Sequence, residues 1–479
     1  MDDLGQDLRL AFRSFVKSPA FTAVVVLTLA LGIGANTAIF TLMDQVLLRF
    51  LPVEDPERLV ILDAPGQFSG SSHSHNQLAP ISHPMFEGLR DRNTVFAGVL
   101  AHYTAPVHLT SGSQTDSVNG DLVSGTFFDV LGLKPAAGRL FTPDDDRIPG
   151  GHPVVVLSHG FWTRRFGGDP KVVGQTVRVN DHPMTVIGVS PRGFHGVEVG
   201  EAEDVFVPIM MQAQVIPTWD RGVGDWRARW LTAMARLKAG VSQTEARAGI
   251  NLLYRQLLEE DAQHLTSKSE RFRTAFLAKQ LELRPGARGT SGLRDQSRTP
   301  LFVLMGMVGL VLLIACANVA NLLLARASSR QREMAVRLAL GAGRTRLVRQ
   351  LLVESVVLSI AGGVLGLVFA AWTGDLLLGA LPIEGAARVL TAEPDLRVGL
   401  FALGLSLLTG LAFGLAPAFQ STRPALAPTL KSEAGAVIGG AVPFRFRKGL
   451  VVAQVALSLL LLIGAGLFAR SLMNLRTLD

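Results

Sequence analysis

The chain has 479 residues, of which 48% are hydrophobic and 18% are charged. A soluble globular protein averages roughly 25% charged residues, so the composition argues against an all-soluble chain, and 48% is too low for a chain that lies wholly in lipid. The mixture predicts several membrane spans of about 20 residues each and a sizeable water-exposed domain. The single cysteine, Cys316, excludes an internal disulfide framework and a cysteine-based zinc site.

The N-terminal region predicts an amphipathic helix followed by a membrane span. In residues 1–19, apolar residues recur at helical spacing with basic residues between them. This pattern is typical of a cytoplasmic helix on an anionic membrane surface, and an ordinary solvated helix is the alternative. Ser18 and Pro19 mark the next helix start. The apolar run within residues 20–48 is longer than a signal-peptide core of about 7–15 residues and predicts the first transmembrane span.

Further apolar runs complete a predicted bundle of five spans. They cover residues 299–325, 351–382, 396–420 and 449–469. The connection 326–350 holds seven arginines and a single acid, and the linker 421–448 is also basic. The positive-inside rule therefore places the N-terminus, this loop and this linker in the cytoplasm. The excess of 46 Lys and Arg over 39 Asp and Glu is then largely topological, and nucleic acid is not an expected partner.

Residues 49–298 are predicted to form a large extracytoplasmic domain, so the fold class is an α+β membrane protein with this domain inserted between spans one and two. Local patterns within it indicate particular elements. These are a strand at 154–157 before a helix start at Ser158, a hairpin around Asn180 and Asp181, a strand at 231–237, and a helix opened by a capping box of Ser242 and Glu245. Residues 64–80 and 284–299 are predicted as loop and linker.

Catalytic motifs are missing from the sequence. No lysine follows a glycine, which excludes a standard P-loop, and neither Gly-x-Ser-x-Gly nor His-Glu-x-x-His occurs. His73, His75 and His83 favour a solvated loop over a zinc site. The run Asp144–Asp146 favours a turn or helix start over calcium binding. We therefore expect no enzyme activity in this chain, no directly bound metal or cofactor, and ATP use only by a partner ATPase.

Several residues within the spans are candidates for packing or charge pairing. Gly362 and Gly366 in the third span, and Gly410 and Gly414 in the fourth, are spaced for close helix contact. Glu354 lies near the predicted cytoplasmic boundary, where it is expected to pair with an arginine such as Arg349, Arg346 or Arg423. Asp375 lies near the opposite boundary.

The connection 328–349 is the most informative segment. Ser329 is a possible cap, Glu333 falls in the first helical turn, and Met334 and Leu338 share one face. Gly341 and Gly343 then end the predicted helix. A short helix with an apolar face and flanking arginines is suited to dock into a cytoplasmic partner, and a simple amphipathic surface elbow is the alternative.

These segments resemble a known family. Residues 332–342 (REMAVRLALGA) and 351–366 (LLVESVVLSIAGGVLG) resemble the permease domain of MacB/FtsX-like ABC transporters. Ser82–Pro84 with Phe86 and Leu89–Arg90, residues 123–138 (VSGTFFDVLGLKPAAG) and residues 155–168 (VVLSHGFWTRRFGG) resemble the matching MacB-like periplasmic core domain. The chain is also similar to duplicated permeases of soil bacteria, in which two such halves are fused.

The resemblance implies a multi-pass protein of the bacterial inner membrane that couples a separate ABC ATPase to a periplasmic domain, for export or mechanotransmission. It implies that residues 330–340 form the coupling helix. The docking contacts are expected to be Arg330, Glu333, Met334, Arg337, Leu338 and Gly341. Membrane lipid is an expected partner, as is a periplasmic adaptor or outer-membrane channel. The alternative function is a regulatory scaffold that controls a periplasmic cell-wall hydrolase or sensor.

The fifth apolar run departs from simple four-span relatives. In the duplicated relatives such a span opens the second half. We therefore expect the chain to be the N-terminal part of a longer duplicated permease, or to pair with itself.

Overall fold

The computed structural model describes residues 2–74, 78–219, 222–265, 269–329, 343–380, 395–421 and 441–476. The described chain divides into two compact units. The helical unit comprises the described parts of Met1–Gln45, Ser297–Pro382 and Leu390–Asp479, and the sheet unit is built on Val46–Gln296. Each unit is described by itself.

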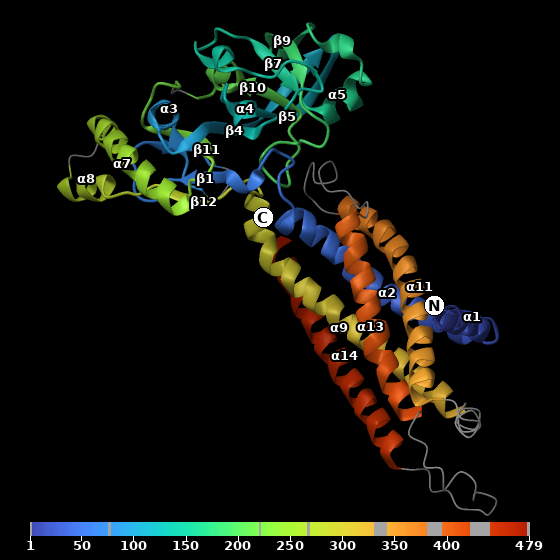
Figure 1. Ribbon diagram of the computed structural model, residues 1–479. Coiled ribbons are helices and arrows are strands. Elements are labelled where there is room, and N and C mark those ends of the chain that lie inside the picture. Colours follow the sequence, from blue (N-terminus) through green and yellow to red (C-terminus); the bar gives the residue numbers. More distant parts are fainter. Residues whose placement is uncertain are drawn as a thin grey trace, which may run out of the picture. The chain divides into compact units, whose positions relative to one another are not determined.

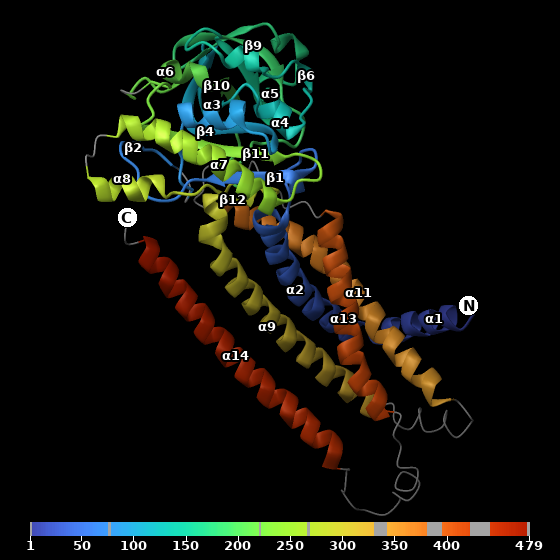
Figure 2. The ribbon, with the colours of Figure 1, turned by 60° about the vertical axis from the view of Figure 1, so that its left-hand side comes forward.

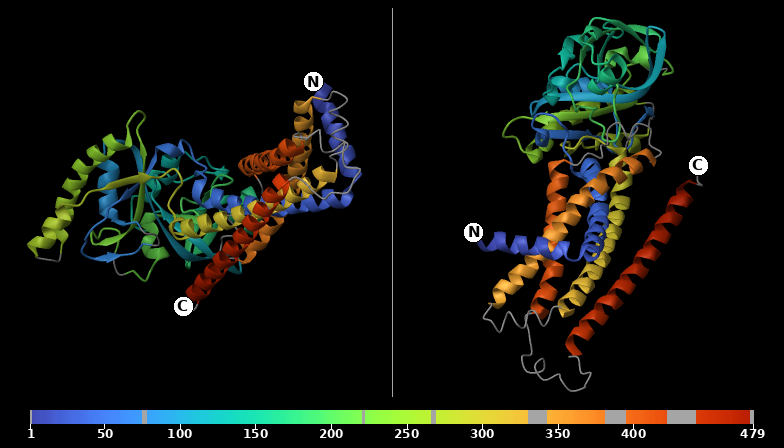
Figure 3. Two further views of the ribbon diagram at one scale, coloured as in Figure 1. Left: turned by 90° about the horizontal axis from the view of Figure 1, so that it is seen from below. Right: turned by 90° about the vertical axis from the view of Figure 1, so that its right-hand side faces the viewer.

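The helical unit, shown in Figure 1, is built from long apolar helices and the short amphipathic helix α1. Their bounds are α1 Asp2–Val16, α2 Pro19–Met43, α9 Gly292–Ser329, α11 Arg344–Ala380, α13 Leu396–Ser421 and α14 Ala441–Arg476. A π-helical segment, Asp44–Leu48, continues α2. Pro19 stands at the first turn of α2, where the missing N–H has no intrahelical partner to lose. Helix α1 lies across the long helices and not along them (Figure 3).

Four helices in the described residues are long and apolar enough to cross a membrane. They are Pro19–Leu48, Ser297–Arg326, Arg344–Gly374 and Leu396–Leu415. Large apolar side chains face outward on them, including Leu27, Val368 and Trp372, each more than half exposed, as expected for helices whose solvent is lipid. Helix α14 contains a shorter apolar stretch, Val451–Leu467, and lies to one side of the other helices (Figure 2). A fifth crossing therefore stays a prediction.

The sheet unit is one mixed sheet with helices packed on it. The neighbouring strands run in the order β12-β1-β11-β4-β5-β10-β7-β9-β6, with β2 and β3 on β11, and β8 beside β4 and β9. The bounds are β1 Leu59–Asp63, β2 Ser71–Ser72, β3 Ile81–Ser82, β4 Phe96–Ser111, β5 Gln114–Val123, β6 Ala137–Gly138, β7 Val154–Leu157, β8 Thr176–Val179, β9 His182–Val189, β10 Val205–Pro208, β11 Ala228–Leu237 and β12 Glu282–Pro285. The helices are α3 His83–Arg92, α4 Phe127–Leu131, α5 His159–Phe166, α6 Gln212–Val215, α7 Gln243–Asp261 and α8 Glu270–Leu277.

The long strand β4 joins the two halves of this sheet. Its first part, from Phe96 to His102, pairs with β11, whereas the part from His102 to Ser111 pairs with β5. Most pairs are antiparallel, and β10–β5, β7–β9 and β11–β2 are parallel. The core beneath the sheet contains completely buried aromatic and aliphatic side chains such as Phe86, Tyr254 and Phe276.

The local predictions for this unit are confirmed at most positions. Ser158 caps α5 through the Phe161 N–H, and Ser242 and Glu245 form the capping box of α7. Asn180 and Asp181 have φ of 46° and 68°, the left-handed backbone that a tight hairpin needs. The linker predicted at 284–299 is wrong in its second half, because α9 already begins at Gly292 and continues without a break into the apolar run.

Candidate functional site: the helix bundle and its polar contacts

Helix α11 packs against α2 on one face and against α13 on another, and glycines lie at both contacts. A Cβ added at Gly362 would lie 2.7 Å from the Leu29 Cβ, and one at Gly366 would lie 3.0 Å from the Ala30 carbonyl oxygen and the Gly34 nitrogen. All three neighbouring residues belong to α2. The absence of a side chain therefore allows the two backbones to touch.

The contact between α11 and α13 is also made at glycines. A Cβ at Gly410 of α13 would lie 3.0 Å from the Val356 Cα of α11, and one at Gly414 would lie 2.8 Å from the Ser355 side chain. These four glycines thus lie where α2, α11 and α13 approach most closely. Helices held at backbone distance on two sides of α11 have little freedom to slide past each other.

The span α2 also contributes polar contacts. The Asn36 amide, 4% exposed, donates hydrogen bonds to the Gly32 carbonyl of its own helix and to the Val308 carbonyl of α9, both at 2.8 Å. Asp44, at the end of α2, lies 3.7 Å from the Arg397 guanidinium of α13. Sequence reasoning missed both, although a lone Asn or Asp within or at the end of an apolar run is the signal that marks such residues.

Charged contacts fasten α1 to the long helices. The Arg349 Nε of α11 donates to the buried Asp7 carboxylate at 2.8 Å, and Arg346 donates to the Gln6 amide oxygen at 3.0 Å. At the other end of α1, Arg326 of α9 donates to the Ser14 hydroxyl at 3.0 Å. The helix expected on the membrane surface is therefore also bound to α9 and α11.

Of the other predicted site residues, Glu354 lies inside α11 and the docking residues lie outside the described part of the chain. Glu354 is 8% exposed within α11, and its pairing with an arginine stays a prediction. Residues 330–342 lie outside the described residues. This range holds all six expected docking residues: Arg330, Glu333, Met334, Arg337, Leu338 and Gly341.

Those residues considered as metal ligands that the structure describes make contacts within the fold. The His73 ring stacks on Trp219 with centroids 4.7 Å apart, and His75 lies outside the described residues. The run at 144–146 starts a 3-10 helix whose capping box is made by Thr142 and Asp145, which confirms the predicted helix start. Among the residues that the structure describes, no group of three or more His, Cys, Asp or Glu side chains is placed to hold a metal ion.

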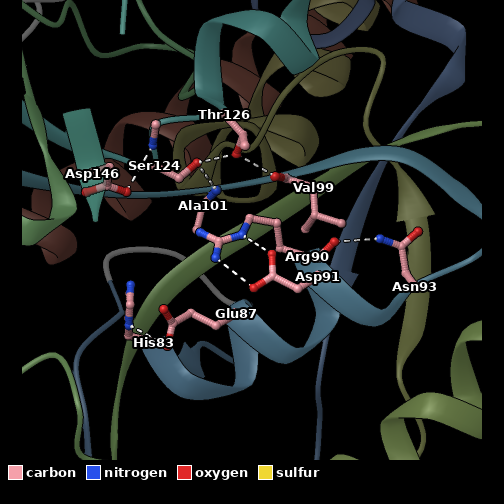
Figure 4. A network of polar contacts seen from close by, with 11 residues as sticks. His83, Glu87, Arg90, Asp91, Asn93, Val99, Ala101, Ser124, Thr126 and Asp146 are labelled. Atoms are coloured by element: carbon pink, nitrogen blue, oxygen red, sulfur yellow. Dashed lines mark hydrogen bonds and ion pairs between the residues drawn. The ribbon is translucent and has the colours of Figure 1, made fainter. Parts of the chain in front are cut away.

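In the sheet unit, a polar network surrounds α3 and the turn after β5 (Figure 4). Asp146 is 4% exposed and accepts hydrogen bonds from the Gly125 and Met210 backbone N–H groups at 3.0 and 2.9 Å. Burial raises the pKa of Asp146 to about 6, although these hydrogen bonds oppose the shift. His83 is 2% exposed, and burial, with a smaller effect of the Arg90 charge, lowers its pKa to about 4. The Arg90 charge of α3 also acts on Asp146 and lowers its pKa, so the two groups of contacts are linked electrostatically.

The spans and the sheet unit together define a multi-pass membrane protein with a large α+β domain between its first two spans. The model of the MacB-like periplasmic core domain matches residues 22–253, and that of the FtsX-like permease C-terminal region matches residues 305–425. The chain therefore belongs to the MacB/FtsX-like ABC transporter permeases.

Several relatives share much of the chain. It is 24% identical over 427 residues to the macrolide export ATP-binding/permease protein MacB of Nitrobacter winogradskyi, covering 88% of this chain and 59% of that protein. It is 28% identical to the probable export ATP-binding/permease protein MacB of Pseudomonas entomophila, covering 63% and 40%. The chain thus spans about half the length of these curated relatives. The solved periplasmic region of MacB from Actinobacillus actinomycetemcomitans matches with 17% identity and a TM-score of 0.34, covering 51% of this chain and 92% of that one.

Proposed function

We propose that this chain is the permease subunit of an ABC-type transporter. In this proposal an ATPase partner docks on residues 330–340 of the loop between α9 and α11, and the spans pass its motion to the sheet unit in the periplasm. The observation that carries the proposal is the bundle itself, in which α11 is in backbone contact with α2 and α13. A displacement at the start of α11 would then move three helices together.

The sequence supports ATP hydrolysis by a partner ATPase, with this chain providing the docking site and the membrane spans. No P-loop occurs in these 479 residues, whereas the relatives carry ATP-binding and permease functions in their names. The arginines of the loop support a cytoplasmic position for it, by the positive-inside rule. The hydrolysis of ATP is therefore assigned to a partner, and docking to Glu333, Met334, Arg337 and Leu338.

The test is ATPase stimulation by the full chain reconstituted with an ABC ATPase that co-purifies with it. Glu333→Arg, or Met334→Asp with Leu338→Asp, is expected to abolish stimulation while membrane insertion is unchanged. Val336→Asp is the matched control, because at helical spacing it falls on the face opposite Met334 and Leu338. Stimulation at the native level by the Met334/Leu338 pair would contradict the docking assignment. Co-purification of a cell-wall hydrolase without transport activity would favour the regulatory scaffold.

A further inference from the structure

The middle of β4 carries a buried group of ionisable side chains that the proposed function does not use. His102 stands where β4 changes its pairing from β11 to β5. Its Nδ1 lies 3.3 Å from the Asp121 carboxylate of β5, and both side chains are almost completely buried. We refer to His102, Asp121, Glu198 and Glu203 as the pivot cluster.

Glu203 is the unusual member of the pivot cluster. It is 2% exposed, and neither carboxyl oxygen has a hydrogen-bond partner in the part of the chain that the structure describes. The Asp121 Oδ2, the His102 Nε2 and the Thr104 hydroxyl are also buried without a hydrogen-bond partner. A buried carboxylate without a partner is costly unless it takes up a proton and becomes neutral.

The loop 190–204, which carries Glu198 and Glu203, is hydrogen-bonded to the residues that lead into α9 and to its first residue, Gly292. The Val199 N–H donates to the Thr290 carbonyl and the Thr290 N–H donates to the Val197 carbonyl, both at 2.9 Å. The Ser291 hydroxyl donates to the Val199 carbonyl at 2.9 Å. The Glu198 carboxylate accepts a hydrogen bond from the backbone of Gly292, the first residue of α9, where a helix start favours an acid.

The opposite end of the same loop is bonded to the sheet. The Asp204 N–H donates to the Asn119 carbonyl of β5, and the Ser158 N–H before α5 donates to the Asp204 carbonyl, both at 2.8 Å. The Glu203 N–H donates to the His195 carbonyl within the loop at 2.9 Å. The loop therefore connects the centre of the sheet to the start of a membrane-spanning helix.

The charges around Glu203 oppose its ionisation. Burial raises the pKa of Glu203 well above its ordinary value, and the Asp121 charge raises it further. Burial also raises the pKa of Glu198, against the attraction of His102. Burial lowers the pKa of His102, but the charge and hydrogen bond of Asp121 outweigh it and the net direction is upward. The charged and titratable groups from the surrounding elements are His102, Asp121, His159, Arg164, His195, Glu198, Glu201 and Asp204.

We propose that Glu203 is a proton-controlled latch between the sheet and α9. While its carboxyl group holds a proton, loop 190–204 stays docked between β5 and the first turn of α9. Loss of that proton places a negative charge without a partner beside the Asp121 carboxylate, and the loop and the start of α9 are released together.

The direction of the pH effect follows from the raised pKa. The contribution of Glu203 to docking is complete below the ordinary glutamate value of 4.5 and is lost as the pH rises through its raised pKa. His102 acts in the same direction, because its pairing with Asp121 is complete below 6.5 and is lost as the pH rises through its own raised pKa. Docking is thus strongest in mild acid.

The latch is tested by hydrogen exchange on the full chain in lipid nanodiscs, at about pH 5.5 and about pH 8.5, with rates corrected for intrinsic exchange. Protection of the Val199 and Thr290 amides is expected to fall by up to about tenfold per pH unit, the limit for one proton, between the ordinary glutamate pKa of 4.5 and the raised pKa of Glu203, and to level off above it. Glu203→Gln is expected to keep these amides protected at both pH values. Glu201→Gln, which removes a charge from a half-buried side chain of the same loop, is the matched control and should retain the pH dependence.

Two results would overturn the latch. One is native protection that does not change with pH, and the other is a Glu203→Gln profile that follows the native one. Amides of the β4–β5 pair, such as Val107, report whether each variant is folded. If Glu203→Gln fails that check, His102→Gln decides. His102→Gln removes the second proton-dependent contribution to docking, so the fall in protection with rising pH should become shallower. An unchanged profile refutes the proposal.

Discussion

The closest backbone contact in the bundle offers a direct test of its packing. A Cβ added at Gly34 of α2 would lie 2.8 Å from the Gly366 carbonyl oxygen, and one added at Gly366 would lie 3.0 Å from the Gly34 nitrogen. Neither atom is the end of a flexible side chain, so α2 and α11 must move apart. Overpacking of this kind costs about 1–3 kcal/mol, against a helix-propensity gain of up to about 1 kcal/mol for Gly→Ala.

Gly404→Ala is the matched control, because a Cβ there meets no atom within 4 Å while the propensity gain is the same. We expect Gly34→Ala and Gly366→Ala each to be less stable than this control by about 1–3 kcal/mol. The double variant should lose less than the sum of the two, since both new methyl groups enter one contact. The measurement is unfolding of the purified chain in mixed micelles of rising SDS fraction. Single variants as stable as Gly404→Ala, or losses that add fully, would refute this account of the contact.

Two further predictions concern pH and topology. Because the pKa of His83 is lowered to about 4, its contribution to stability is present above pH 6.5 and is lost as the pH falls toward 4. Between pH 6.5 and 4 the native protein should lose up to about 3 kcal/mol of folding free energy through His83, and His83→Gln should not lose this contribution. The measurement is the melting temperature of the native protein and the variant across that range. An equal fall in both would count against the prediction. Single cysteines at Ser113 and Ser432, with Cys316 replaced by alanine, should react with an impermeant thiol reagent in intact spheroplasts at 113 only. Labelling at 432 but not at 113 would reverse the topology.

Local patterns predicted the elements better than their arrangement. The capping box of Ser242 and Glu245 and the hairpin at Asn180 depend on neighbouring residues, so the sequence carries them directly. Strand order depends instead on pairs far apart in the chain, such as Val60 with Ala235 and with Pro285. No short window contains such a pair. The error at 284–299 has another cause: the polar, glycine-containing composition favoured a loop, whereas the Ser291 hydroxyl caps α9 through the Arg294 N–H and the helix continues into the apolar run.

The packing residues were easier to predict than the ionisable ones. Glycines four residues apart indicate close helix contact, although their spacing does not say which helix is the neighbour. The pivot cluster gave no such signal, because His102, Asp121 and Glu203 come from three separate segments. Each alone is an ordinary polar residue in a water-exposed domain. Their proposed role follows from buried atoms without hydrogen-bond partners in the described residues, above all both carboxyl oxygens of Glu203, which only the folded chain shows.

The continuity of α9 bears on how such a protein would couple its parts. Residues 292–296 of α9 belong to the sheet unit, and the same helix continues as the span Ser297–Arg326. Within the helical unit, α9 is joined to α2 by the Asn36–Val308 hydrogen bond and to α1 by Arg326. A movement of α2, α11 and α13 therefore has a hydrogen-bonded path into α9. At its N-terminal end, α9 and the residues just before it are hydrogen-bonded to loop 190–204, which carries Glu198 and Glu203. The helix that carries motion would then also be the one whose first turn responds to a proton.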